Sequence, residues 1–442
     1  MDRVDASVLR SSVQSMLASP LSYVHGLGRW GRPVVLGIIE QGIYSAANFA
    51  FAVVLLNGIG ARQFGTFNIA WSVVMLAECI LYSLFGDAVP AIANRLPKVL
   101  WPELRASVYM WSALFSAAVM LAAAALSLAA QWFAPSAVGL VLATGVTVFT
   151  MRAQQMGRRI CYLDGTRGLA VIGAILFSVT IFASLAVLLW SGVRSGVAGM
   201  LCLGLGCAAS SSALLLRRRD FAWPGARLFI WSWHKLWRSG RWLTAASISY
   251  WAANTGLIPL AGAMFGREAG GVLRIVQTLT NPLSQLTSVV VSVVLPPAAE
   301  RLRVPSRGMF ARISIRSFVL FAAISAVYSV GLTFCGPALV NLLFHGKLTA
   351  ITMAVLAVAS VAASLDMIAA ALTVPLLATS RTSVILYGRI ASLFALFAVL
   401  PFALRLPGLI AFVSVTAASN LVQTLVLAFC QLRQFERLPH AR

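Results

Sequence analysis

Residues 44–65 read YSAANFAFAVVLLNGIGARQFG, and residues 250–271 read YWAANTGLIPLAGAMFGREAGG. The two stretches lie 206 residues apart, and the same offset holds without a gap over residues 44–96. Eleven of these 53 positions are identical, about twice the number expected by chance in a chain so rich in small apolar residues. The identities include two glycines, a proline and an arginine, residue types that mark turns and helix ends. The pattern indicates an internal duplication.

The composition places most of the chain in lipid. Of its 442 residues, 60% are apolar and 10% are charged, and the mean hydropathy is +0.88. A soluble domain carries about 25% charged residues. The apolar runs are continuous, whereas the strands of a membrane barrel are about 10 residues long and alternate in polarity. We therefore expect an all-α polytopic membrane protein.

Twelve transmembrane helices are predicted, because each crossing needs about 20 mostly apolar residues. The expected spans are 34–56, 67–93, 106–130, 136–151, 168–190, 195–216, 243–264, 271–297, 317–337, 350–376, 383–404 and 408–431. Six spans separate the two copies, so both copies run the same way through the membrane. Parallel repeats occur in transporters whose substrate site lies between the two halves.

The repeat predicts a domain organisation. We expect a cytoplasmic N-terminal tail (1–33), an N-terminal six-helix bundle (34–216), a basic, Trp-rich cytoplasmic linker (217–242), a C-terminal six-helix bundle (243–432) and a cytoplasmic C-terminal tail (433–442). The first 20 residues lack the apolar core of a signal peptide, which agrees with a cytoplasmic tail.

The positive charges support this topology. The segments expected in the cytoplasm hold 28 Lys and Arg, the outside loops hold 5, and Arg274 is the only one assigned to the interior of a span. This asymmetry is the one that the positive-inside rule describes. The net charge of +22 is thus spread over short segments that face one leaflet. Anionic membrane lipids are the expected partners, and no nucleic acid is expected.

Cofactors are not expected. The six cysteines include no CxxC pair, and the four histidines fall in predicted loops or tails. Neither a disulfide framework nor a metal site is indicated.

Span eight contains the main candidates for a substrate cavity. Arg274, Gln277, Asn281 and Gln285 are spaced by three, four and four residues, so they share one helix face. An ionisable residue inside a span is energetically costly and is therefore a functional candidate. Hydrogen bonding between helices of a bundle is the alternative role for such side chains.

Further candidates come from the repeat. Asn68 occupies the position equivalent to Arg274, and Glu78 lies beside the helix face of span two that corresponds to the polar face of span eight. Asn48 and Asn254 each follow a tyrosine by four residues on the first span of each half. Close helix packing and contact with cargo both remain open for these two asparagines.

Carboxylates within the spans are candidates for ion coupling, because protonation removes the charge of a buried acid. Asp366, Glu40 and Asp87 are the residues concerned, with Glu78 as a fourth. Each of them could instead form a static ion pair with Arg274 or Arg389.

Several longer motifs resemble those of bacterial polysaccharide flippases. The motifs are GARQFGTFNIAWSV from residue 60, AMFGREAGGVLRIVQTLTNPLSQL from 263, VVLPPAAERL from 293 and GPALVNLLFHGKLTAITMAVLAV from 336. These flippases belong to the multidrug/oligosaccharidyl-lipid/polysaccharide exporter (MOP) superfamily. The resemblance implies two six-helix bundles in a V around a central cavity.

The resemblance also implies a function. It would be the translocation of undecaprenyl-pyrophosphate-linked oligosaccharide across the bacterial cytoplasmic (inner) membrane by alternating access, for exopolysaccharide, capsule or O-antigen biosynthesis. Polysaccharide polymerase and export machinery would then be further partners. The multidrug branch of the superfamily shares the architecture.

Three other functions have to be compared with the sequence. An enzyme is not expected, because the outside loops contain a single acid, Glu268. A multidrug/cation antiporter fits the acids Glu40, Glu78 and Asp366, whereas Arg274 favours an anionic cargo. A purely structural membrane protein does not explain the duplicated polar faces.

The topology can be tested with reporter fusions. Fusions at residues 62, 194 and 405 should read as extracytoplasmic, because these positions lie in the charge-poor loops. A cytoplasmic signal at these positions would contradict a twelve-span arrangement with both termini inside.

Overall fold

The computed structural model describes the backbone of residues 20–87, 89, 92, 97–216, 223–302, 306–345, 348, 350–379, 383–406 and 408–438. The side chains of residues 20–34, 87, 98, 239, 288–290, 292–297 and 299–301 fall outside the description. Residues 1–19 and 439–442, which belong to the two predicted tails, also lie outside it.

Helices form all the regular structure of the described residues. The α-helices are α2 (Pro20–Ile59), α3 (Ala61–Leu81), α5 (Trp101–Phe133), α6 (Val138–Leu163), α7 (Arg167–Trp190), α8 (Gly196–Leu216), α9 (Ala226–Ala253), α10 (Leu257–Phe265), α11 (Arg267–Arg301), α12 (Arg307–Phe344), α13 (Met353–Ala378), α14 (Ser383–Ala403) and α15 (Leu409–Arg437). A π-helical turn, η1 (Tyr82–Asp87), extends α3.

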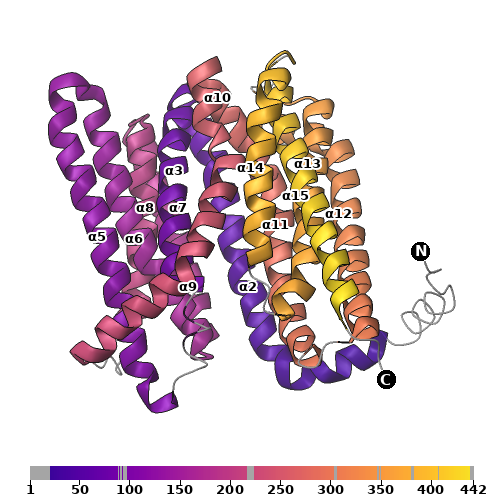
Figure 1. Cartoon of the computed structure of the whole chain (residues 1–442). Helices are drawn as coiled ribbons and strands as arrows, with labels where there is room; N and C mark the ends of the chain where they lie inside the picture. Colours follow the sequence, from indigo (N-terminus) through magenta and orange to yellow (C-terminus); the bar gives the residue numbers. More distant parts are fainter. Residues whose placement is uncertain are drawn as a thin grey trace.

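The helices form two groups with the same pattern of neighbours (Figure 1). In the first group α5 packs on α6, α6 on α8, α7 on α8, and α2 on α7. In the second group the corresponding pairs are α12 with α13, α13 with α15, α14 with α15, and α9 with α14. Each pair occupies the same place in the order of spans within its half, which agrees with a parallel duplication.

Backbone details repeat as well. Gly60 (φ 82°, ψ 161°) and Gly266 (φ 89°, ψ 159°) are equivalent in the repeat, and both adopt a conformation that glycine favours. Each forms the turn into the second span of its half. The positive φ requires glycine there, which explains why this position is identical in both copies.

The two halves meet at equivalent glycines. A Cβ atom added to Gly271 of α11 would lie 3.3 Å from the backbone nitrogen of Gly65 of α3, and the two residues are related by the 206-residue offset. Equivalent residues that touch must lie on the pseudo-twofold axis that relates the copies. The axis therefore passes between Gly65 and Gly271, near the end of the bundle that the charges place outside.

Within the described part of the chain, ten helices are long and apolar enough to cross a membrane, and they match ten of the twelve predicted spans. The other two spans are unusual. Span seven is broken: α9 ends at Ala253 and α10 starts at Leu257, because Pro259 has no N–H to bond the carbonyl of Thr255 and its ring would clash with that carbonyl. Span eight lies within α11, a 35-residue helix.

The fourth span is longer than predicted. It was expected to end at residue 151, but α6 continues to Leu163 and carries Arg152 and Arg158 inside the bundle. Arg152 is fully buried and Arg158 is mostly buried. The assignment of Arg274 as the only basic residue within a span was therefore wrong. Without these two arginines, the predicted cytoplasmic segments hold 26 Lys and Arg in place of 28, against 5 in the outside loops. The charge asymmetry therefore remains.

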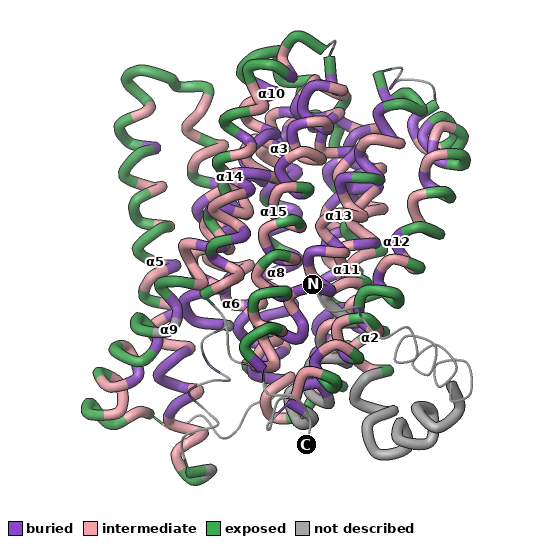
Figure 2. Tube along the Cα trace, turned by 45° about the vertical axis from the view of Figure 1, so that its right-hand side comes forward, coloured by how far each residue is buried: buried purple, intermediate pink, exposed green. Residues whose placement is uncertain are grey.

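The outer helices expose apolar side chains. In Figure 2, α5 and α12 are mostly exposed or intermediate along their length, whereas much of α3 and α13 is buried. Leu121, Leu128 and Phe133 on α5, and Val327 and Leu342 on α12, are among the exposed side chains. Such long apolar faces are compatible with lipid as the surrounding solvent.

The close approach at Gly65 predicts a steric effect. A Cβ atom there would lie 2.0 Å from the carbonyl oxygen of Arg267, so Gly65→Ala should destabilise the protein by roughly 1–3 kcal/mol through overpacking. Gly42→Ala on α2, where a Cβ meets no atom within 4 Å, is the matched control and should be neutral or stabilising. Thermal unfolding in detergent measures both, and equal effects would contradict the packing argument.

Candidate functional site

Arg274 lies at the contact between the two halves. Its guanidinium carbon is 5.8 Å from the ring centroid of Trp71 on α3, and its side chain is half-buried. The outer end of α11, Arg267, lies seven residues earlier, so Arg274 is about 10 Å from that end. Among the described residues, Arg274 forms no ion pair and no side-chain hydrogen bond. The alternative of a static pair with Asp366 or Glu78 is therefore wrong.

The remaining polar residues of α11 connect different parts of the molecule. Gln277 donates to the carbonyl oxygen of Asn254 at 3.1 Å, at the break in span seven. Gln285 accepts a hydrogen bond from Gln41 of α2, so it joins the two halves. Asn281 is half-buried on the same helix. The predicted polar face of α11 thus contacts span seven and the opposite half, and it does not face lipid alone.

Glu40 belongs to a cluster in the first half. It is fully buried, forms an ion pair with Arg158 and accepts a hydrogen bond from the hydroxyl of Tyr162 at 2.6 Å. Arg158 also donates to Gln41 at 3.0 Å, and its guanidinium carbon lies 4.2 Å from the ring centroid of Tyr44. The ionic partner of Glu40 is thus Arg158, whereas the sequence suggests Arg274 or Arg389.

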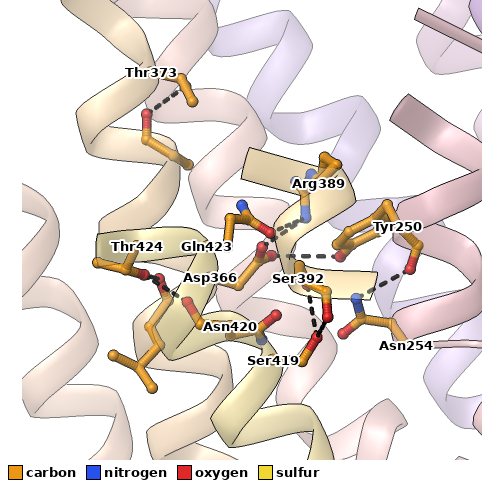
Figure 3. Close-up of polar contacts among 12 residues, drawn as sticks. Tyr250, Asn254, Asp366, Thr373, Arg389, Ser392, Ser419, Asn420, Gln423 and Thr424 are labelled. Atoms are coloured by element: carbon orange, nitrogen blue, oxygen red, sulfur yellow. Dashed lines mark hydrogen bonds and ion pairs between the residues drawn. The ribbon is translucent and has the colours of Figure 1, made fainter. Parts of the chain in front are cut away.

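Asp366 belongs to a similar cluster in the second half (Figure 3). Arg389 of α14 lies 3.3 Å from its carboxylate and donates to Gln423 at 2.9 Å. The hydroxyl of Tyr250 donates to the other carboxylate oxygen at 3.4 Å, and the Arg389 guanidinium carbon lies 4.0 Å from the Tyr250 ring centroid. Side-chain exposures are 19% for Asp366 and 22% for Arg389, against 0% for Glu40. Asp366 is therefore the more accessible of these two carboxylates.

Glu78 forms a third ion pair. Its carboxylate lies 3.5 Å from Arg152 of α6, whose Nε donates to Ser112 of α5 at 2.7 Å. Glu78 and Arg152 are both buried, so this pair connects α3, α5 and α6 inside the first bundle. Neither Arg152 nor Arg158 is a candidate from the sequence, because the predicted fourth span ends at residue 151 and leaves both in a loop.

The remaining candidates lie in different surroundings. Asn68 is fully buried and donates to the carbonyl oxygen of Phe64. Asn48 is exposed, and Asn254 is half-buried; each donates to the carbonyl oxygen of the tyrosine four residues earlier. The side chain of Asp87 lies outside the described residues.

Ion pairs with arginines neutralise the buried carboxylates of these clusters. Each of the three described carboxylates Glu40, Glu78 and Asp366 lies within 3.5 Å of an arginine nitrogen. Arg274 has no such partner in the described part of the chain. Its positive charge at the contact between the halves is therefore not compensated by any described carboxylate.

The sequence matches no protein-family model and no curated protein. The structure is similar to that of an inward-facing multidrug resistance MATE family transporter of the MOP superfamily, with a TM-score of 0.73, 13% identity, and 91% of this chain and 98% of that chain covered. It is also similar to the lipid II flippase MurJ in an inward closed conformation, with a TM-score of 0.64, 12% identity and 89% of each chain covered.

A third similar structure is a MOP superfamily transporter from Pyrococcus furiosus described as having a binding pocket of reverse polarity. Its TM-score is 0.59 at 14% identity, with 91% of this chain and 94% of that chain covered. At such low identities these likenesses establish the fold. The prediction of an all-α, MATE-like transporter fold is confirmed, and the chain is a multi-pass membrane protein.

The buried pair predicts a stability effect. Arg152→Met leaves the Glu78 carboxylate buried without its ionic partner, which should destabilise the protein by about 3–5 kcal/mol. The double variant Arg152→Met/Glu78→Gln removes both charges and should recover much of this loss. Fluorescence-detected size-exclusion chromatography measures the amount of folded protein. Wild-type amounts of the single variant would show that the pair is not needed for folding.

Proposed function

We propose that the protein translocates a polyprenyl-pyrophosphate-linked oligosaccharide across the bacterial cytoplasmic membrane, with both termini in the cytoplasm. The observation that carries this proposal is the half-buried guanidinium of Arg274, which faces Trp71 across the contact between the halves and has no carboxylate partner among the described residues. A charge inside a membrane protein without a partner of its own indicates a charged cargo.

The chemistry of arginine favours a phosphate-containing cargo. A guanidinium is planar, stays charged and presents a fork of donors that matches phosphate or carboxylate oxygens. Such charge-assisted hydrogen bonds are stronger than neutral ones. The pyrophosphate of a lipid-linked oligosaccharide offers several such oxygens.

Neighbouring amides suit the sugar part of the cargo. Gln277, Asn281 and Gln285 lie on the helix face of Arg274, and Asn48 is exposed on α2. Amide groups both donate and accept hydrogen bonds, as sugar hydroxyl groups do. These residues would provide a polar surface for a glycan as it crosses about 30 Å of hydrocarbon.

The multidrug/cation antiporter is the competing function. A cationic cargo needs an available carboxylate, whereas Glu40, Glu78 and Asp366 are each paired with an arginine. This pairing supports the anionic cargo. Among the coupling candidates, Asp366 is more exposed than Glu40 and is the better candidate for proton exchange. Polysaccharide polymerase and export machinery remain predicted partners.

Arg274 provides the test. Arg274→Ala should reduce export of the surface polysaccharide at least about tenfold, because one charge-assisted contact contributes roughly 1.5–3 kcal/mol. Arg274→Lys keeps the charge but not the fork and should retain part of the activity. The amount of folded protein should stay at the wild-type level, because no carboxylate loses its partner.

The matched control is Arg405→Ala, which removes an exposed arginine at the same end of the molecule and should leave export unchanged. Normal export by Arg274→Ala would overturn the proposal. Resistance to cationic drugs that depends on Glu40, Glu78 or Asp366 would favour the antiporter instead.

A further inference from the structure

The first half of α9 has one face fixed to the N-terminal bundle. Phe229 stacks on Trp111 of α5 with 4.3 Å between the ring centroids, and the ring centroid of Trp233 lies 5.0 Å from that of Trp111. The indole Nε1 of Trp111 donates to the carbonyl oxygen of Phe229 at 3.1 Å. Gly240 packs against Leu84 of η1, where an added Cβ atom would lie 2.8 Å from the side chain. These contacts fix the rotation of α9 about its own axis.

The opposite face of this segment is exposed and basic. Its exposed residues include Arg227, Ile230, His234, Lys235, Trp237, Arg238, Arg241 and Trp242. No aspartate or glutamate occurs over residues 221–267. Trp237 and Trp242 are 50% and 56% exposed, and the Arg241 guanidinium carbon lies 5.0 Å from the Trp242 ring centroid. The face thus combines four permanent cations with exposed indole rings.

The position of this face along α9 indicates what binds it. The same unbroken helix continues to Ala253 and packs on α14, and the predicted span begins at residue 243. From this boundary we infer that Arg238, Arg241, Trp237 and Trp242 lie where the hydrocarbon meets the headgroups. Tryptophan is enriched at this level of a membrane, and basic residues there attract anionic lipids.

We propose that the exposed face of α9 between Arg227 and Trp242 binds anionic phospholipid headgroups of the cytoplasmic leaflet. The helix runs obliquely from beside the lower part of α5 towards α10 (Figure 1). It carries Tyr250, whose hydroxyl bonds Asp366, and Trp251, whose indole donates to the carbonyl oxygen of Ser72 at 2.8 Å. Headgroups bound at one end of α9 thus stabilise the orientation of a helix that contacts both halves. This surface lies apart from Arg274, so the proposal does not depend on the cargo.

The test uses the full-length protein in neutral detergent, titrated with phosphatidylglycerol and, separately, phosphatidylcholine. The thermal unfolding temperature should rise with phosphatidylglycerol but not with phosphatidylcholine or inorganic phosphate. The variant Arg227→Gln/Arg238→Gln/Arg241→Gln should need at least about tenfold more phosphatidylglycerol for the same rise, since it removes three surface cations. Added salt should weaken the wild-type response.

Two further variants make the result specific. Arg62→Gln/Arg194→Gln/Arg405→Gln removes three exposed charges at the opposite end and should respond like the wild type. Arg227→Lys/Arg238→Lys/Arg241→Lys keeps the charge and should also respond like the wild type. Equal weakening by both glutamine variants, or an unchanged response of the α9 glutamine variant, would overturn the proposal. A full response to inorganic phosphate would assign the face to a free anion instead.

Discussion

A buried charge must find a partner, and this constraint organises the interior of the molecule. An ion taken out of water loses several kcal/mol of solvation unless nearby groups replace it. Glu40, Glu78 and Asp366 each meet this requirement with an arginine from another helix. The three pairs hold α2 to α6, α3 to α6, and α13 to α14. The charges therefore specify which helices lie side by side in a membrane where apolar contacts alone discriminate poorly.

The duplication explains some of this arrangement but not all of it. Tyr44 and Tyr250 are equivalent, and each has a guanidinium over its ring. The two arginines are not equivalent, because Arg158 lies on the fourth span of its half and Arg389 on the fifth. The acids differ in the same way, with Glu40 on the first span and Asp366 on the fourth. The two halves thus share the tyrosine at the equivalent position, but the acid and the arginine around it come from different spans in each half.

Sequence patterns predicted what depends on local rules. Apolar runs predicted the spans, the 206-residue offset predicted the equivalent turns at Gly60 and Gly266, and helical spacing predicted the polar face of α11. The predicted fourth span ends at residue 151 because charged residues normally mark the end of a span, and Arg152 follows. Its predicted length of 16 residues, against about 20 for a full crossing, was a signal that it continues. The partners of Arg152 are Glu78 and Ser112, which lie on other helices, and no spacing along one helix reveals them. The break in span seven did have a local signal, Pro259.

The two ends of the contact between the halves are held by different forces, and this difference bears on how the protein opens. Near the outer end, α3 and α11 touch through glycine backbone, so that separating them exposes a closely packed surface. Towards the inner end, α2 and α11 are joined by a side-chain hydrogen bond between Gln41 and Gln285. The first half of α9 stays packed on the N-terminal bundle through Phe229, Trp233 and Gly240. A hydrogen bond of this kind contributes roughly 1 kcal/mol net, because water replaces it when it breaks. The inner contact between α2 and α11 is therefore less costly to separate than the glycine contact between α3 and α11. Opening at this end would break one hydrogen bond between α2 and α11 and would keep the closely packed contact between α3 and α11.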